Sequence, residues 1–302
     1  MSWKQRNPDK AGSWDKPLSK TFEGETHMAV NVYEIVTERI IKKLESGVIP
    51  WRKPWNSCGA VNWETQREYR GINAMLLDPG EYATFNKIKE SGGKVKKGAK
   101  AQIAVFWKMI DGEDSEGNPK KIPYLRYYSV FEINSQVEGM DSKRKDKEAL
   151  EHNPIDSAEQ IKEGYQHCPP ITFAPGKAFY RPSTDSISVP AITDYHNPEE
   201  FYSTMFHEMV HSTGHKNRLN RSGIINVAAF GSETYSKEEL VAEIGAAMLC
   251  TVAGIDQTTF ENSASYVSSW LRVLKGDNKM IVTAASQAQK AADHIRGIAV
   301  NY

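Results

Sequence analysis

The sequence predicts an α+β fold with two domains. Three observations lead to this prediction. The 302-residue chain is long enough for two hydrophobic cores. Its net charge of zero conceals a basic first part and an acidic second part. Between these parts lies a mixed-charge stretch without apolar periodicity. We therefore expect a tail at 1–28, a first domain at 29–135, a linker at 136–155 and a second domain at 156–302.

The charge asymmetry limits the partners of each part. Residues 1–126 carry 22 lysines and arginines against 16 aspartates and glutamates, whereas residues 127–302 carry 16 against 22. The excess is densest in residues 42–108, with 13 basic side chains against 6 acidic ones. Two domains with different partners are indicated. A protein that mimics DNA needs a strongly acidic surface, so this charge distribution argues against mimicry.

Composition also bears on location. No apolar run is long enough to span a bilayer, and the N-terminal stretch lacks the apolar core of a secretory signal. Three widely spaced cysteines, Cys58, Cys168 and Cys250, do not form a disulfide framework. We therefore expect a cytoplasmic protein without a membrane partner.

The first domain is expected to begin with a helix. Apolar residues recur with the helical period from Val32 to Leu44, and Gly47 is placed to end the helix. Residues 82–93 predict a short helix closed by glycine. Residues 102–108 and 125–131 predict two paired strands, with a polar loop at 112–119 between them.

Cations interleaved with aromatic residues in this domain favour binding of single-stranded nucleic acid. Cations follow phosphates, and exposed rings stack on bases without sequence preference. A solvated lysine turn and buried tryptophans would give the same pattern, so both interpretations remain open. The candidate residues are Trp51, Arg52, Lys53, Trp55, Arg70, Lys94, Lys96, Lys97 and Lys100.

The second domain is expected to start with a helix near residues 158–165 and a short sheet. Residues 171–173, 178–180 and 185–190 predict strands. A short sheet followed by a metal-binding helix is typical of small zinc peptidases, in which an edge strand can hold an extended peptide. Residues 186–189 are our candidate edge strand, and an internal strand is the alternative.

The helix that follows carries the most informative motif, H-E-x-x-H at residues 207–211. Positions i and i+4 share one helix face, so His207 and His211 can bind one zinc ion. Glu208 is expected to take a proton from water at this ion. Asn197 and Gly214 predict the two ends of the helix.

Zinc requires a third protein ligand, which the sequence places on a second apolar helix. Residues 236–239 form a capping box, and a nearly all-apolar run follows. Glu243 lies inside that run, where an unpaired carboxylate is costly. Glu239 is the competing ligand, although it would stand near the helix start. We favour Glu243 from burial alone, and expect small neighbours to let the two helices approach closely.

The resemblance to a known family rests on combined motifs. Residues 38–55 (ERIIKKLESGVIPWRKPW), 69–73 (YRGIN) and 82–101 (YATFNKIKESGGKVKKGAKA) resemble the N-terminal domain of the ArdC antirestriction family. Residues 206–215 (FHEMVHSTGH) and 238–249 (EELVAEIGAAML) resemble its zincin-like, SprT-like metallopeptidase domain. The resemblance implies a plasmid-borne protein that protects incoming DNA during conjugation and binds single-stranded DNA non-specifically. It also implies Glu208 as the catalytic base.

Two functions therefore compete. The first is a DNA-bound zinc peptidase acting on an unknown protein, such as a host DNA-associated protein. The second is a module that shields DNA, with a structural or inactive metal domain. A structural zinc site needs four protein ligands and no base, so Glu208 favours hydrolysis. Candidates for stabilising the oxyanion are Tyr235, His215 and Arg218, by sequence proximity only.

Overall fold

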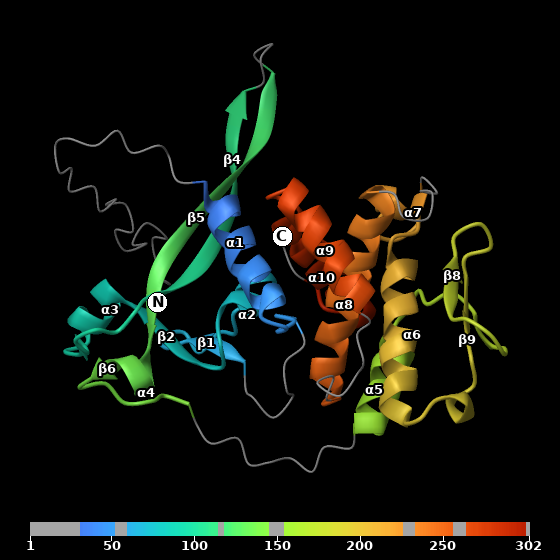
Figure 1. The fold of residues 1–302 in the computed structure, drawn as a ribbon, viewed down its shortest axis with the longest axis horizontal. Coiled ribbons are helices and arrows are strands. Elements are labelled where there is room, and N and C mark those ends of the chain that lie inside the picture. The colour runs from blue at the N-terminus through green and yellow to red at the C-terminus, as the bar shows by residue number, and fades with distance from the viewer. Residues whose placement is uncertain are drawn as a thin grey trace, which may run out of the picture. The chain divides into compact units, whose positions relative to one another are not determined.

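The computed structural model describes residues 31–51, 59–113, 118–144, 154–225, 233–255 and 264–299. All of these except Asn31 belong to one compact unit, Val32–Tyr302. It contains both helices and strands, which confirms the predicted α+β class (Figure 1). Within the described ranges, no helix is both long and apolar enough to cross a bilayer.

The first helix, α1 (Val32–Glu45), forms where the apolar period predicts it. Val36, Ile40 and Leu44 are buried along one face. The chain leaves the helix at Gly47, whose φ of 80° is a left-handed conformation that glycine adopts without a steric penalty.

A four-stranded sheet follows, in the order β1-β2-β5-β4. Strands β4 (Gln102–Glu113) and β5 (Pro119–Glu132) form a long antiparallel ribbon, which confirms the predicted pairing (Figure 1). The ribbon is longer than predicted, because both strands extend into the expected loop. Strand β1 (Ala60–Asn62) runs parallel to β2 (Gly80–Thr84).

Three short helices and a small two-stranded sheet accompany this sheet. The helices are α2 (Ile72–Leu76), α3 (Phe85–Glu90) and α4 (Ile133–Gln136). Thr84 caps α3 by accepting a hydrogen bond from the Lys87 amide. Strand β3 (Lys94–Val95) pairs with β6 (Val137–Glu138). Strand β6 therefore packs with the first half, although it lies in the predicted linker.

The second sheet has three short strands in the order β7-β9-β8. These follow helix α5 (Pro154–Gly164) and comprise β7 (Ile171–Phe173), β8 (Phe179–Arg181) and β9 (Ser186–Val189). The expectation that residues 186–189 form an edge strand is wrong. Strand β9 pairs with β7 on one side and with β8 on the other, so its backbone groups are already used.

Among the described residues after β9, the regular elements are one 3-10 turn at Ile192–Asp194 and a series of α-helices. These helices are α6 (Pro198–Thr213), α7 (Ser222–Ile225), α8 (Glu233–Ala253), α9 (Ala264–Gly276) and α10 (Met280–Ile295). Helix α8 packs against α6 and α10 (Figure 1). The sheet β7-β9-β8 contacts the other side of α6 through β8 and β9.

One hydrophobic core joins both halves of the chain. Val36 of α1 and Trp51 belong to the same buried cluster as Trp270 of α9. The two indole rings meet edge to face, with centroids 5.2 Å apart. The Thr37 hydroxyl donates to the Asn278 carbonyl at 2.6 Å. The halves are thus packed together, and the exact domain boundary stays a prediction.

Candidate metal centre

Helix α6 is defined by its two ends. The Asn197 side chain accepts a hydrogen bond from the Glu200 amide at 2.8 Å, which confirms the predicted cap. Gly214 ends the helix as predicted, but with an ordinary right-handed φ of −73°. Its lack of a side chain gives room instead, because a Cβ there would lie 2.5 Å from Cγ1 of Ile224.

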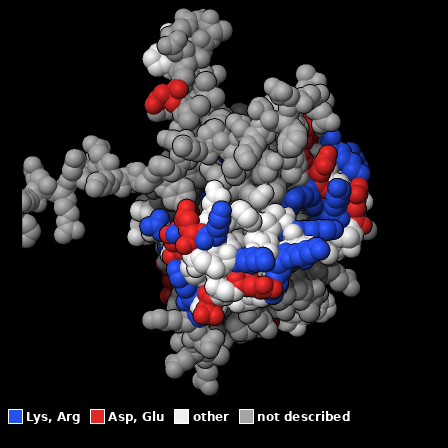
Figure 2. Space-filling view, turned by 90° about the vertical axis from the view of Figure 1, so that its left-hand side faces the viewer, with Lys and Arg blue, Asp and Glu red and all other residues white. Residues whose placement is uncertain are grey.

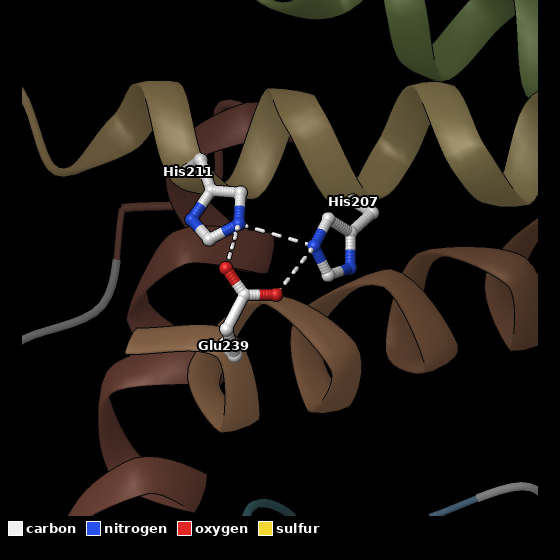
Figure 3. Close-up of side chains that lie close together, drawn as sticks. All are labelled: His207, His211 and Glu239. Carbon is white, nitrogen blue, oxygen red and sulfur yellow. Dashed lines mark hydrogen bonds and ion pairs between the residues drawn. The ribbon is translucent and has the colours of Figure 1, made fainter. Parts of the chain in front are cut away.

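Helix α8 approaches α6 closely at Gly245. A Cβ at this position would lie 2.8 Å from Cγ2 of Val210, which confirms that small residues allow the approach. Helix α8 already includes Glu233, so the predicted capping box at 236–239 is wrong. Glu239 therefore lies within the helix, and its carboxylate faces the imidazoles of α6 (Figure 3).

Three side chains converge between these helices (Figure 3). The Nε2 atoms of His207 and His211 are 3.0 Å apart. The Glu239 oxygens lie 3.5 Å from Nε2 of His207 and 3.4 Å from Nε2 of His211. Two donors bound to one tetrahedral zinc ion at its usual bond lengths are about 3.3 Å apart. The donor set and its spacing therefore fit a single divalent ion.

The preference for Glu243 as third ligand is corrected by this geometry. The side chains of Glu239 and Glu243 are 20% and 23% exposed, so burial does not distinguish them. Their direction does. The Glu243 carboxylate lies 3.8 Å from Nδ1 of His207, on the far side of the ring from the convergent Nε2 atoms. Glu239 alone contacts both imidazoles at Nε2.

The pKa values of the three groups record this convergence. Burial lowers the pKa of His211, but hydrogen bonds with Glu238 and Glu239 outweigh it and raise the pKa to about 10. Burial of His207 is likewise outweighed by Glu239, so its pKa is raised. Burial raises the pKa of Glu239, but both imidazoles outweigh it and hold that pKa far below its usual value. A metal ion would replace the imidazole protons.

A buried ion pair beneath His211 was not found by sequence reasoning. Glu238 contacts Nδ1 of His211 at 3.4 Å and accepts a hydrogen bond from Nη2 of Arg221 at 2.6 Å. Glu238 and Arg221 are both 6% exposed. The adjacent pair Glu238 and Glu239 was the available signal for one partner. No sequence signal pointed to Arg221, because it lies in a polar stretch 17 residues before Glu238.

Glu208 is buried beside the cluster, at 8% exposure. Burial raises the pKa of the Tyr195 hydroxyl, and the negative charge of Glu208 raises it further, so this hydroxyl lies in its vicinity. The suggested oxyanion residues His215 and Arg218 both contact Asp185 instead. The side chain of Tyr235 lies outside the described residues.

The predicted DNA-binding residues have different surroundings in the structure. Trp51 is 6% exposed and packs in the core, so its expected stacking on bases is wrong. Arg70 pairs with the buried Asp293. Lys96 donates to two backbone carbonyls of α4. Lys94 lies on β3, and Lys97 and Lys100 follow it in the chain. Arg52, Lys53 and Trp55 lie outside the described residues.

Comparisons with known families agree with this architecture. Residues 30–131 match the N-terminal domain of anti-restriction factor ArdC. Residues 166–287 match a zincin-like metallopeptidase family. The second match includes both histidines and the four glutamates Glu208, Glu238, Glu239 and Glu243.

Among similar proteins, y4eC of Sinorhizobium fredii (strain NBRC 101917 / NGR234) is 31% identical over 87% of this chain and 91% of its own length. A DNA primase TraC of Escherichia coli is 32% identical, but the chain spans only 20% of that protein. The metal-free crystal structure of the antirestriction ArdC protein from plasmid R388 is 36% identical, with a TM-score of 0.68 over 88% of this chain and 97% of the other. Its Mn(II)-bound structure is 34% identical, with a TM-score of 0.69 over 89% and 98%.

The fold and the site thus define a two-part protein, an ArdC-type N-terminal domain followed by a zincin-like metallopeptidase domain. Because the similarity covers 97% of the ArdC protein from plasmid R388 at 36% identity and 91% of y4eC at 31% identity, the chain belongs to the ArdC antirestriction family.

Proposed function

We propose that this chain is an antirestriction protein of a mobile element that binds single-stranded DNA and hydrolyses protein through a metal-dependent site. The observation that supports hydrolysis is the convergence of His207, His211 and Glu239 next to the buried Glu208. Zincin-like domains use a divalent ion, and the donor set fits zinc.

In the proposed mechanism, His207, His211 and Glu239 hold the ion. When bound, zinc supplies a Lewis acid that polarises the scissile carbonyl and makes water more acidic. Glu208 follows the first ligand on the same helix and takes the proton of the attacking water. It then passes this proton to the leaving amine. Its burial keeps the carboxylate close to the site and away from bulk solvent.

The alternative is a DNA-shielding protein whose metal domain is structural or inactive. Structural zinc sites are closed by four protein ligands. Among the described residues, only three donors lie within 4.8 Å of one another. The fourth position is then available to water or substrate, which favours hydrolysis.

Glu208→Gln tests the peptidase proposal. The variant should bind zinc like the wild type, while hydrolysis of a protein substrate with single-stranded DNA present falls by a factor on the order of 100 or more. Glu199→Gln, in the first turn of the same helix, is the matched control. Equal hydrolysis by Glu208→Gln and wild type would remove the assigned base. Zinc binding without any hydrolysis by the wild type would support the alternative.

The proposal of DNA binding is supported by a basic surface. Figure 2 shows lysine and arginine side chains gathered, with fewer acidic ones, on the side of α3, β3 and β6. Lys94 lies on β3 itself, and Lys97 and Lys100 follow that strand in the chain. Two exposed aromatic residues lie diagonally across the β4–β5 ribbon. Phe106 is 49% exposed and Tyr128 is 46% exposed. Cations for phosphates and rings for bases are the two components that single strands require.

Variants of the full chain separate these components. The triple alanine variant of Lys94, Lys97 and Lys100 should bind single-stranded DNA more weakly, with a salt slope lower by about 0.7 per lost phosphate contact. The double alanine variant of Phe106 and Tyr128 should weaken binding without changing the slope. Phe173→Ala, an exposed ring of β7, should leave binding unchanged. Unchanged affinity in both multiple variants would place DNA elsewhere.

Protection of DNA is proposed to follow from occupancy rather than hydrolysis. Coating of the incoming strand would block restriction without cleavage of a host protein. A restriction challenge with Glu208→Gln tests this point, because the variant should protect DNA as well as the wild type. Lost protection with normal DNA and zinc binding would instead assign protection to proteolysis.

A further inference from the structure

Helix α8 presents three carboxylates to the two imidazoles of α6, and they do not occupy equivalent positions. Glu239 contacts both rings at Nε2. The other two approach the opposite ring nitrogen. Oε1 of Glu238 lies 3.4 Å from Nδ1 of His211, and Oε1 of Glu243 lies 3.8 Å from Nδ1 of His207.

We propose that Glu238 and Glu243 are positioning residues, each anchoring the Nδ1 side of one imidazole so that its Nε2 faces the metal ion. This inference rests on the proposed metal centre. A ligating histidine usually donates its other ring N–H to a carboxylate or carbonyl, which fixes its tautomer and orientation and increases its basicity as a ligand. Here one helix supplies the third ligand and both anchors.

Glu238 is suited to an anchoring role because Arg221 fixes it. Nε of Arg221 donates to both carboxylate oxygens, at 3.2 and 3.1 Å. The guanidinium also donates to the Thr213 hydroxyl at 2.6 Å and to the Val210 carbonyl at 2.7 Å. These bonds connect Glu238 to the last turns of α6, the helix that carries His211. The carboxylate is therefore held on the Nδ1 side of the ring, and Arg221 offsets its buried charge.

Glu243 has a different setting. It follows Glu239 by four residues, so both carboxylates lie on the face of α8 that meets His207. The 3.8 Å separation from Nδ1 is that of an ion pair rather than of a direct hydrogen bond. His207 thus lies between two carboxylates, with Glu239 at Nε2 and Glu243 at Nδ1. This arrangement accounts for a second carboxylate in an apolar helix without making it a ligand.

Zinc affinity of the metal-depleted full chain tests the proposal, measured by competition with a chromophoric chelator. Glu238→Gln and Glu243→Gln should each still bind one zinc ion, with affinity reduced on the order of 10- to 100-fold. Their cobalt(II) absorption bands should keep tetrahedral intensity, because all three ligands remain. Glu239→Gln should change the cobalt spectrum itself, since it alters a ligand.

Asp293→Asn is the matched control, because it shows what the loss of a buried carboxylate with only a structural role does to the protein. It removes the negative charge of a buried carboxylate that pairs with Arg70 rather than with an imidazole. It should lower the melting temperature and leave zinc affinity unchanged. If Glu238→Gln does not fold, because Arg221 is left without a counter-charge, Glu238→Gln combined with Arg221→Met removes both charges and is measured instead.

Zinc affinity of Glu243→Gln or the Glu238 variant within threefold of wild type would overturn the assignment of that residue. A changed cobalt spectrum in Glu243→Gln, with a normal one in Glu239→Gln, would make Glu243 the ligand and also overturn it. Absence of zinc binding by the wild type would have a different meaning, because the proposed metal centre itself would then be wrong.

Discussion

At the scale of single residues, the metal centre depends on groups that do not contact the ion. Arg221 is buried and bonds to Glu238, Thr213 and the backbone at the end of α6. A buried pair of this kind contributes little beyond a well-packed apolar pair. Removal of Arg221 is costly, however, because the buried Glu238 carboxylate then keeps only the His211 imidazole as a counter-charge.

Arg221→Met should therefore destabilise the chelator-treated protein by about 3–5 kcal/mol. Urea unfolding followed by circular dichroism gives this free energy. Lys275→Met is the control, because Lys275 and Glu45 form an exposed pair, whose loss should cost about 0–1 kcal/mol. Equal losses in the two variants would show that Glu238 tolerates isolation.

Asp185 provides a pH-dependent contribution outside the metal cluster. Burial raises the pKa of its carboxyl, but hydrogen bonds from Arg218 and Tyr180 outweigh burial and lower it below 3.8. A carboxyl with a lowered pKa in the folded state stabilises the protein above the pKa of the unfolded state. That stabilisation is lost as the pH falls through the folded-state value.

Asp185→Asn should thus be less stable than wild type at pH 7, and the difference should shrink as the pH falls below about 4. Asparagine tolerates the left-handed φ of 46° at this position, so the backbone is preserved. Urea unfolding between pH 3 and pH 7 provides the comparison. A difference that stays constant with pH would assign the effect to packing.

At the scale of secondary structure elements, the crossing of α6 and α8 sets the metal site. The histidines belong to one helix and the carboxylates to the other, so their distances follow from how closely the two backbones approach. Gly245 lies at this contact, against Val210.

Gly245→Ala should separate the helices, because its Cβ would lie 2.8 and 2.9 Å from the two Val210 methyl carbons. We expect a loss of about 1–3 kcal/mol in the free energy of unfolding and a weaker affinity for zinc. Gly164→Ala, at the end of α5, meets no atom within 4 Å and is the control. Unchanged zinc affinity in Gly245→Ala would mean that the crossing adjusts without moving the ligands.

At the scale of the whole molecule, the two halves share one core, although their charges are opposite. Helix α1 contacts α9 and α10, and Trp51 packs on Trp270. The basic first half is thereby joined to the zincin-like half through apolar contacts, to which the ion pairs of Arg70 with Asp293 and of Glu45 with Lys275 are added.

Trp51→Ala should lower stability by about 3–5 kcal/mol, because it empties a buried indole site. Its effect should extend to both halves, so that thermal unfolding and release of bound zinc shift together to lower temperature. Phe85→Ala, which removes a ring that is 54% exposed, should leave both midpoints nearly unchanged. If Trp51→Ala instead weakened DNA binding and left both midpoints unchanged, Trp51 would stack on bases as the sequence predicted.

Local sequence patterns were sufficient to predict some of the helices, strands and site residues of this protein. The period of α1, the pairing of β4 with β5, the Asn197 cap and the i,i+4 histidine pair all depend on residues close in sequence or on strand alternation. For the same reason, the metal motif and the fold class could be predicted. Hydrogen bonds within one helix and side-chain direction along one strand need no knowledge of distant contacts.

Only the tertiary structure decided which glutamate faces both imidazoles, where Trp51 lies and that β9 is a central strand. Glu239 and Glu243 share one face of α8 and are equally buried, so their roles depend on the crossing with α6. Trp51 is buried by α9, a helix more than two hundred residues away in sequence. Such packing is set by contacts between residues far apart in sequence, and composition and periodicity carry no information about these contacts.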